Sequence, residues 1–113
     1  MTPAQSALVE RVRALLVGET VREVSMFGGR SVMVDEKMIA AARKDGGLLV
    51  RVPADDHDEL LRRPGATQAE MGAGRSMGPG WIEVDGDTIA DDDQLAGWFE
   101  IALAHRRASA GGQ

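Results

Sequence analysis

The fold of this chain is decided by Ser25-Met26-Phe27-Gly28-Gly29-Arg30 and by the stretch Val32-Met33-Val34-Asp35-Glu36-Lys37-Met38 that soon follows it. Apolar residues alternate with polar ones on both sides of the glycine pair, and this period of two indicates β-strands. Two consecutive glycines can adopt the positive φ angles of a primed hairpin turn without a clash at Cβ. The pattern therefore predicts a β-hairpin that reverses at Gly28 and Gly29.

The extended pattern continues beyond this hairpin to residue 52. Asp35 and Glu36 mark a second reversal. Because glutamate lacks the freedom of glycine at positive φ, we expect this turn either to be longer than two residues or to keep negative φ angles. Residues 38–43 are rich in alanine, which favours helix, but the run is short and lies between two turns, so we interpret it as a strand. With residues 48–52, the region predicts an antiparallel meander of three or four strands.

A helix is predicted over residues 3–17, before the meander. Its apolar residues recur at offsets of three and four and form one stripe: Leu8, Val9, Val12, Leu15 and Leu16. Thr2 is a suitable N-cap, Gln5 stands where a capping box requires it, and Gly18 supplies the stop.

The second half of the chain predicts helices and short strands. A short helix fits residues 53–63, which begin with proline and acids and end with two arginines. Residues 81–84 read as a strand, and a further short strand is expected around residues 69–71. An amphipathic helix runs from Asp91, its cap, to about residue 107 and places Trp98 and Phe99 in the core.

These elements together predict an α+β fold in the order α-β(3-4)-α-β(2)-α, with helices packed on one face of an antiparallel sheet. We expect one domain over residues 1–107. The alanine-, serine- and glycine-containing tail, residues 108–113, is expected to be disordered.

Composition narrows the function classes. The 113 residues include 18 acidic and 13 basic side chains, so the formal net charge of -5 disfavours direct nucleic-acid binding. The absence of cysteine excludes disulfides, thiolate zinc sites and a cysteine nucleophile. The N-terminus lacks the basic and apolar regions of a secretion signal, and no apolar run approaches the roughly 20 residues needed to span a bilayer. We expect a cytoplasmic protein without membrane contact.

No catalytic, metal-binding or cofactor-binding constellation is evident. We interpret His57, which lies among three aspartates, as part of a solvated helix start, and His105 as part of the positive end of the last helix. The glycine-rich residues 72–80 lead into a strand and not into a helix, which argues against a phosphate-binding loop. Arg75 within that loop could hold an anion through its planar fork.

Four segments together resemble the N-terminal domain of the TfoX/Sxy family, over about residues 9–104. They are Ser25-Met26-Phe27-Gly28-Gly29, Val34-Asp35-Glu36-Lys37-Met38, Gly74-Arg75-Ser76-Met77, and Trp98 in the closing helix. The resemblance implies a compact single α-β module, commonly a dimer, found in bacterial proteins linked to competence and transcriptional regulation, without an established catalytic activity. Glu36 stands where the family usually has glycine.

The resemblance leaves two function hypotheses. The first is a non-catalytic regulatory module that binds a protein partner or a second copy of itself through a free sheet face or edge. Its candidate interaction residues are Met26, Phe27, Gly28, Gly29, Arg75 and Met77. The alternative is a small-ligand or anion-binding protein that uses Arg75 and the glycine-rich loop beside Arg30.

Overall fold

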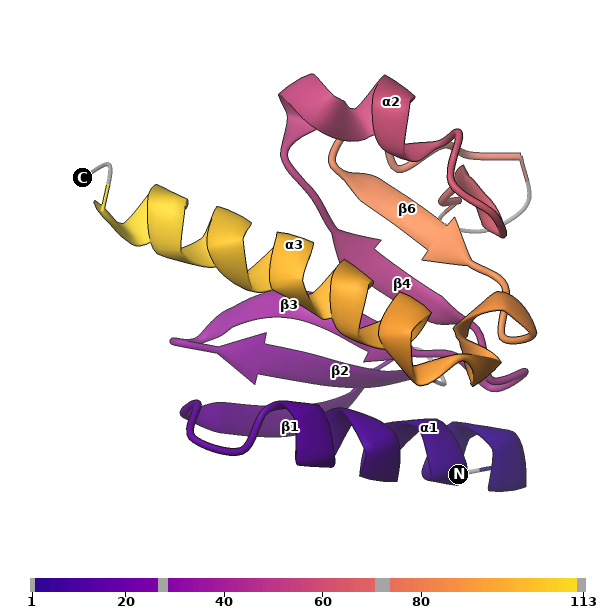
Figure 1. The fold of residues 1–113 in the computed structure, drawn as a ribbon, viewed down its shortest axis with the longest axis vertical. Coiled ribbons are helices and arrows are strands. Elements are labelled where there is room, and N and C mark those ends of the chain that lie inside the picture. The colour runs from indigo at the N-terminus through magenta and orange to yellow at the C-terminus, as the bar shows by residue number, and fades with distance from the viewer. Residues whose placement is uncertain (1, 27–28, 71–73, 112–113) are drawn as a thin grey trace.

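The computed structural model describes residues 2–26, 29–70 and 74–111 and shows three α-helices with a six-stranded antiparallel sheet. This arrangement confirms the α+β class (Figure 1). The sheet order is β1-β2-β3-β4-β6-β5. The elements are α1 Pro3–Leu15, β1 Val21–Met26, β2 Gly29–Val34, β3 Lys37–Ala42, β4 Leu48–Arg51, α2 His57–Leu60, β5 Ala66–Gln68, β6 Trp81–Val84 and α3 Asp92–Gly111, with short 3-10 turns at Ala54–Asp56 and Thr88–Ala90.

Helices α1 and α3 cover the same face of the sheet, and α3 crosses it diagonally (Figure 1). Side chains from both helices and from the facing side of the strands form the main core, in which Trp98 and Phe99 of α3 are almost fully buried. Large aromatic side chains contribute much of the apolar area that such a small core removes from water. The expected placement of helices on one face is therefore confirmed.

The predicted start of α1 is confirmed in detail. The backbone N–H of Gln5 donates to Thr2 Oγ1 over 3.1 Å, and the Gln5 side chain accepts in return from the Thr2 backbone, which completes the capping box. The helix ends at Leu15, two residues before the expected position, and Gly18 follows with φ of +97°. Asp91 caps α3 as expected, because its Oδ1 accepts from the N–H of Asp93 over 2.8 Å.

The first hairpin reverses one residue earlier than the sequence predicts. Met26 pairs with Gly29 and Ser25 with Arg30, so Gly29 belongs to β2 and not to the turn. Residues 27–28 lie outside the described part of the chain. The observed register sets Arg30 opposite Ser25, to which its guanidinium donates a hydrogen bond. This contact between side chains favours the observed pairing and is not visible in the alternation of apolar residues.

The second hairpin contradicts the expectation for Asp35 and Glu36. Val34 pairs with Lys37, so the turn has two residues, and both have positive φ, +54° at Asp35 and +66° at Glu36. A primed turn of this kind matches the right-handed twist of its two strands, and this tertiary requirement overrides the preference of glutamate. Glu36 also forms an ion pair with Arg22 across 2.6 Å.

Replacing Glu36 with glycine is expected to raise the free energy of unfolding by roughly 0.5–1 kcal/mol. Relief of the left-handed backbone is worth about 1 kcal/mol, and the ion pair that is lost is exposed and worth little. Urea unfolding monitored by circular dichroism measures the difference. Asp35→Gly is the matched control and should gain less, because aspartate tolerates positive φ better than glutamate. A lower stability of Glu36→Gly would mean that the Arg22 contact outweighs the strain.

The chain departs from the predicted elements at two further places. The strand expected around residues 69–71 lies earlier, as β5, while Glu70 forms only an isolated antiparallel bridge with Ser76. The backbone of α3 continues to Gly111, so residues 108–111 are helical where a disordered tail is expected; residues 112–113 lie outside the described chain. The alanines there have high helix propensity and no proline interrupts them.

Candidate functional site

The motif residues of the first hairpin lie at the start of the sheet. Met26 ends β1 and Gly29 opens β2, where the two pair, while Phe27 and Gly28 are outside the described residues. Arg30 follows Gly29 in β2, and the structure shows its polar contacts. These contacts determine whether it is available to a ligand.

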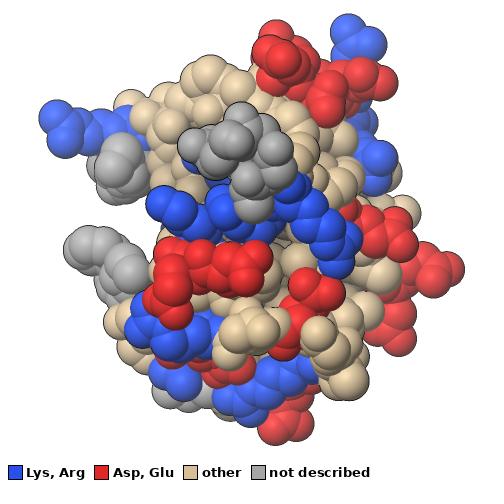
Figure 2. All heavy atoms as spheres, turned by 90° about the vertical axis from the view of Figure 1, so that its left-hand side faces the viewer, with Lys and Arg blue, Asp and Glu red and all other residues tan. Residues whose placement is uncertain are grey.

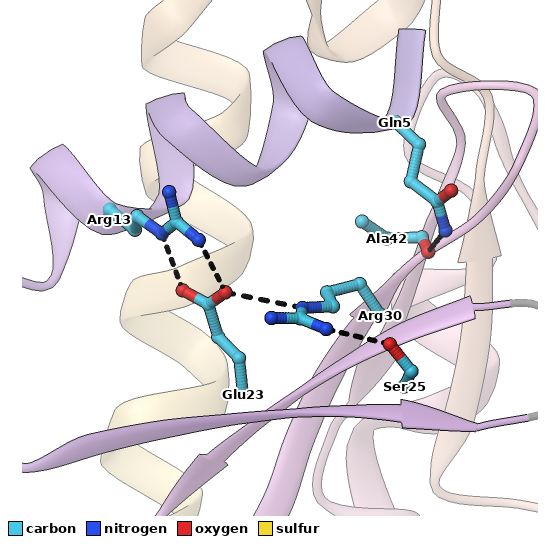
Figure 3. A network of polar contacts seen from close by, with 6 residues as sticks. All are labelled: Gln5, Arg13, Glu23, Ser25, Arg30 and Ala42. Carbon is cyan, nitrogen blue, oxygen red and sulfur yellow. Dashed lines mark hydrogen bonds and ion pairs between the residues drawn. The ribbon is translucent and has the colours of Figure 1, made fainter. Parts of the chain in front are cut away.

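Arg30 belongs to an ion-pair network that joins α1 to β1 and β2 (Figure 3). The Glu23 carboxylate accepts from Arg13 Nε over 2.6 Å, from Arg13 Nη2 over 2.8 Å and from Arg30 Nε over 3.3 Å. Arg30 Nη1 also donates to Ser25 Oγ over 2.6 Å. The hydrogen bond from Arg13, followed by that from Arg30, holds the pKa of Glu23 below its ordinary value. Arg30 is thus engaged in fixing α1 on the sheet.

A second contact fixes the other end of α1. Gln5 is buried, and its Nε2 donates to the carbonyl oxygen of Ala42 at the end of β3 over 2.9 Å (Figure 3). Together with the Arg13 contacts, it determines how α1 lies across the sheet. The helix-covered face is therefore a structural interior.

The opposite sheet face carries a smaller apolar cluster, which we call the second face: Met38, Ala41, Leu49, Ala69, Met77 and Trp81. Ala41, Leu49 and Ala69 are buried, whereas Met38, Met77 and Trp81 are only half-buried. Residues 74–80 return over this side, and the N–H of Met77 donates to the Ala69 carbonyl over 2.9 Å. Met77 therefore packs on the second face, while Arg75 is exposed and no described residue forms an ion pair or hydrogen bond with it.

His57 joins α2 to the end of β5 and to the residue before β6, contrary to the interpretation of a solvated helix start. It is 4% exposed. Its Nδ1 accepts from the Gly80 N–H over 3.0 Å, so the ring proton must be on Nε2, which lies 2.7 Å from Gln68 Oε1. Gln68 Nε2 in turn donates to the carbonyl of Gly78 over 3.1 Å. Leu60, three residues further on in the same short helix, is also buried. This spacing of three was the signal in the sequence that His57 lies on the buried side of the helix.

A groove of about 380 Å³ lies between α1 and the turns at residues 45–47 and 85–87. Two of its four carboxylates hold those turns together, because Asp45 Oδ1 accepts from the Gly47 N–H and Asp85 Oδ1 from the Asp87 N–H. Arg11 at its edge donates to the Ile89 carbonyl. Within residues 2–26, 29–70 and 74–111, no three His, Asp or Glu side chains come together in a way that could hold a metal ion.

Comparison with known proteins gives one family. The sequence model of the TfoX N-terminal domain matches residues 13–106, which include the hairpin motif, the second face and most of α3. No curated protein matches the chain. Among the described residues, no helix is both long enough and apolar enough to cross a membrane.

Proposed function

Because the chain belongs to the TfoX N-terminal domain family, we propose that it is a non-catalytic regulatory module that acts by binding protein, and that its partner is a second copy of itself. The observation that supports the proposal is the second face, where Met38, Met77 and Trp81 are half-buried and no described helix covers them. Methionine and tryptophan are enriched in protein interfaces, because methionine adapts its shape and tryptophan buries a large area.

The charges around the second face favour a copy of the chain as its occupant. Arg43 and Glu83 lie 3.6 Å apart, and Arg22 and Glu36 lie 2.6 Å apart, so acids and bases alternate on this side of a chain whose formal net charge is -5. A surface of one sign would repel its own copy. A two-fold axis can bring these residues of opposite sign together.

Sedimentation equilibrium of purified protein tests the proposal. We expect wild type to be a dimer, and Met38→Glu and Met77→Glu to be monomers, since a carboxylate buried between two copies costs several kcal/mol. Val17→Glu is the matched control; Val17 is 83% exposed beyond the end of α1, so this variant should remain dimeric. Circular dichroism establishes that each variant is folded.

Two results would overturn the proposal that the partner is a second copy of the chain. A wild-type protein that stays monomeric at the highest soluble concentration excludes a second copy as partner. Dissociation by Val17→Glu but not by Met38→Glu or Met77→Glu would move the interface to another surface.

The alternative is an anion site that uses Arg75 and the glycine-rich loop beside Arg30, and the contacts of Arg30 do not favour it. The Arg30 guanidinium is bonded to Glu23 and Ser25, and a ligand would have to displace both. A thermal-shift series with phosphate, nucleotides and carboxylates on wild type and Arg75→Ala tests it directly, because a ligand that binds only the folded state raises Tm.

A further inference from the structure

One arginine lies on the second face, beside its tryptophan. Arg51 of β4 is directly opposite Trp81 of β6, so both side chains lie on the same side of the sheet. Arg51 Cζ lies 5.3 Å from the centroid of the Trp81 ring, and a Cβ placed on Gly80 would lie 3.6 Å from Arg51 Nη1. The half-buried guanidinium is therefore held in place by the indole ring and by the adjacent backbone.

The described residues do not compensate the charge of Arg51, since none of their carboxylates lies within 4 Å of it. Other arginines of the chain do have an acidic partner: Arg11, Arg13, Arg22, Arg30, Arg43 and Arg107. Figure 2 shows such matching at the end of the molecule where α3 finishes, with Lys and Arg atoms next to Asp and Glu atoms. If an interface covers the second face, it must supply an acceptor to Arg51, because an unpaired buried charge is costly.

An unpaired acid borders the same face. Glu70 follows Ala69, which is fully buried in the second face, and it forms an antiparallel bridge with Ser76. The N–H of Met77, the next residue, donates to the Ala69 carbonyl, so the backbone at Glu70 is held against the returning segment. Glu70 is exposed, and no basic side chain in the described part of the chain lies within 4 Å of its carboxylate.

We infer that Arg51 of one copy forms an ion pair with Glu70 of a second copy, and that this pair gives the second face its specificity for the copy. The inference rests on the proposed self-association. A two-fold dimer makes every contact twice, so one unpaired arginine and one unpaired glutamate per chain compensate each other completely. A guanidinium that already lies over an indole ring also loses little conformational freedom on binding, and arginine and tryptophan often dominate the binding energy of an interface.

Charge reversal tests the ion pair by sedimentation equilibrium at constant ionic strength. Arg51→Glu and Glu70→Arg should each weaken self-association at least about tenfold, because each variant sets like charges opposite one another twice. An equimolar mixture of the two variants should form a heterodimer with an affinity within about threefold of wild type, since opposite charges then meet at both contacts. Mixing cannot restore an ion pair within one chain, so recovery in the mixture identifies a contact between copies.

Arg62→Glu is the matched control, since it makes the same charge change at an exposed residue beyond the end of α2. It should remain dimeric and should not restore association of Glu70→Arg. Circular dichroism establishes that each variant is folded. If Arg51→Glu does not fold, Arg51→Gln takes its place and should still weaken association severalfold.

The outcomes separate the ion pair from self-association itself. A wild-type dimer that Met77→Glu dissociates, but that neither Arg51→Glu nor Arg51→Gln weakens, would overturn the ion pair and leave self-association standing. A mixture of Arg51→Glu and Glu70→Arg that stays monomeric would also overturn the ion pair. A monomeric wild type would overturn both proposals.

Discussion

His57→Ala is expected to lower the free energy of unfolding by about 2–4 kcal/mol, because it leaves the buried Gly80 N–H without an acceptor, removes a partner of Gln68 and opens a cavity. Urea unfolding at pH 7 measures the loss. Asp58→Ala, an exposed residue on the same short helix, is the matched control and should change stability by less than about 0.5 kcal/mol.

Hydrogen exchange distinguishes the anchoring role of His57 from a general effect on the core. In His57→Ala, the amide of Gly80 should exchange faster than in wild type by more than global destabilisation accounts for, since its acceptor is gone. Amides in α1 should follow global stability alone. Equal acceleration at Gly80 and in α1 would show that His57 stabilises the whole fold without fixing the chain at residues 78–80.

Glu23→Gln is expected to cost about 1–2 kcal/mol at pH 7, because glutamine offers one acceptor to two guanidinium groups and presents an amide donor to them. The Glu23 side chain is 15% exposed, which limits solvent screening of these contacts. Glu19→Gln is the control. Glu19 is half-buried but pairs with Arg107, whose side chain is exposed, and its loss should cost less than about 0.5 kcal/mol.

The effect of Glu23→Gln should depend on pH. Since the pKa of Glu23 is lowered in the folded protein, its contribution is fully present above its unfolded value of about 4.5 and is lost as the pH falls through the folded value. The stability difference between wild type and Glu23→Gln should therefore be constant near neutrality and shrink towards zero in acid. Urea unfolding at a series of pH values measures it. A difference that persists at pH 2 would assign the effect to packing and not to the carboxylate charge.

The sequence predicts those elements that local rules control. Alternation between residues 21 and 52 gives the strands, and the Thr2 capping box and the Asp91 cap give the starts of the two long helices. Local rules fail at Glu36, where the twist of two strands imposes a positive φ that glutamate disfavours. They also fail at Gly29, because the hairpin register satisfies side-chain contacts of Arg30 that apolar periodicity does not encode.

The candidate sites are predicted less well, since they depend on residues far apart in the chain. Met77 does lie on a half-buried surface, but this surface depends on Leu49 of β4 and Trp81 of β6. The spacing of His57 to Leu60 can indicate a buried side of the short helix, but it does not indicate the partners Gln68 and Gly80, which lie 11 and 23 residues further along the chain.

The position of α3 as the last element affects how this protein folds during synthesis. Neighbouring strands β1 to β4 pair in chain order, so they can associate as soon as they leave the ribosome. Their apolar side, however, packs against Trp98 and Phe99, which are translated near the end. A nascent chain therefore presents an uncovered apolar sheet face until translation is almost finished. A chain that ends before residue 98 would leave this face permanently exposed, so that it would bind chaperones or aggregate.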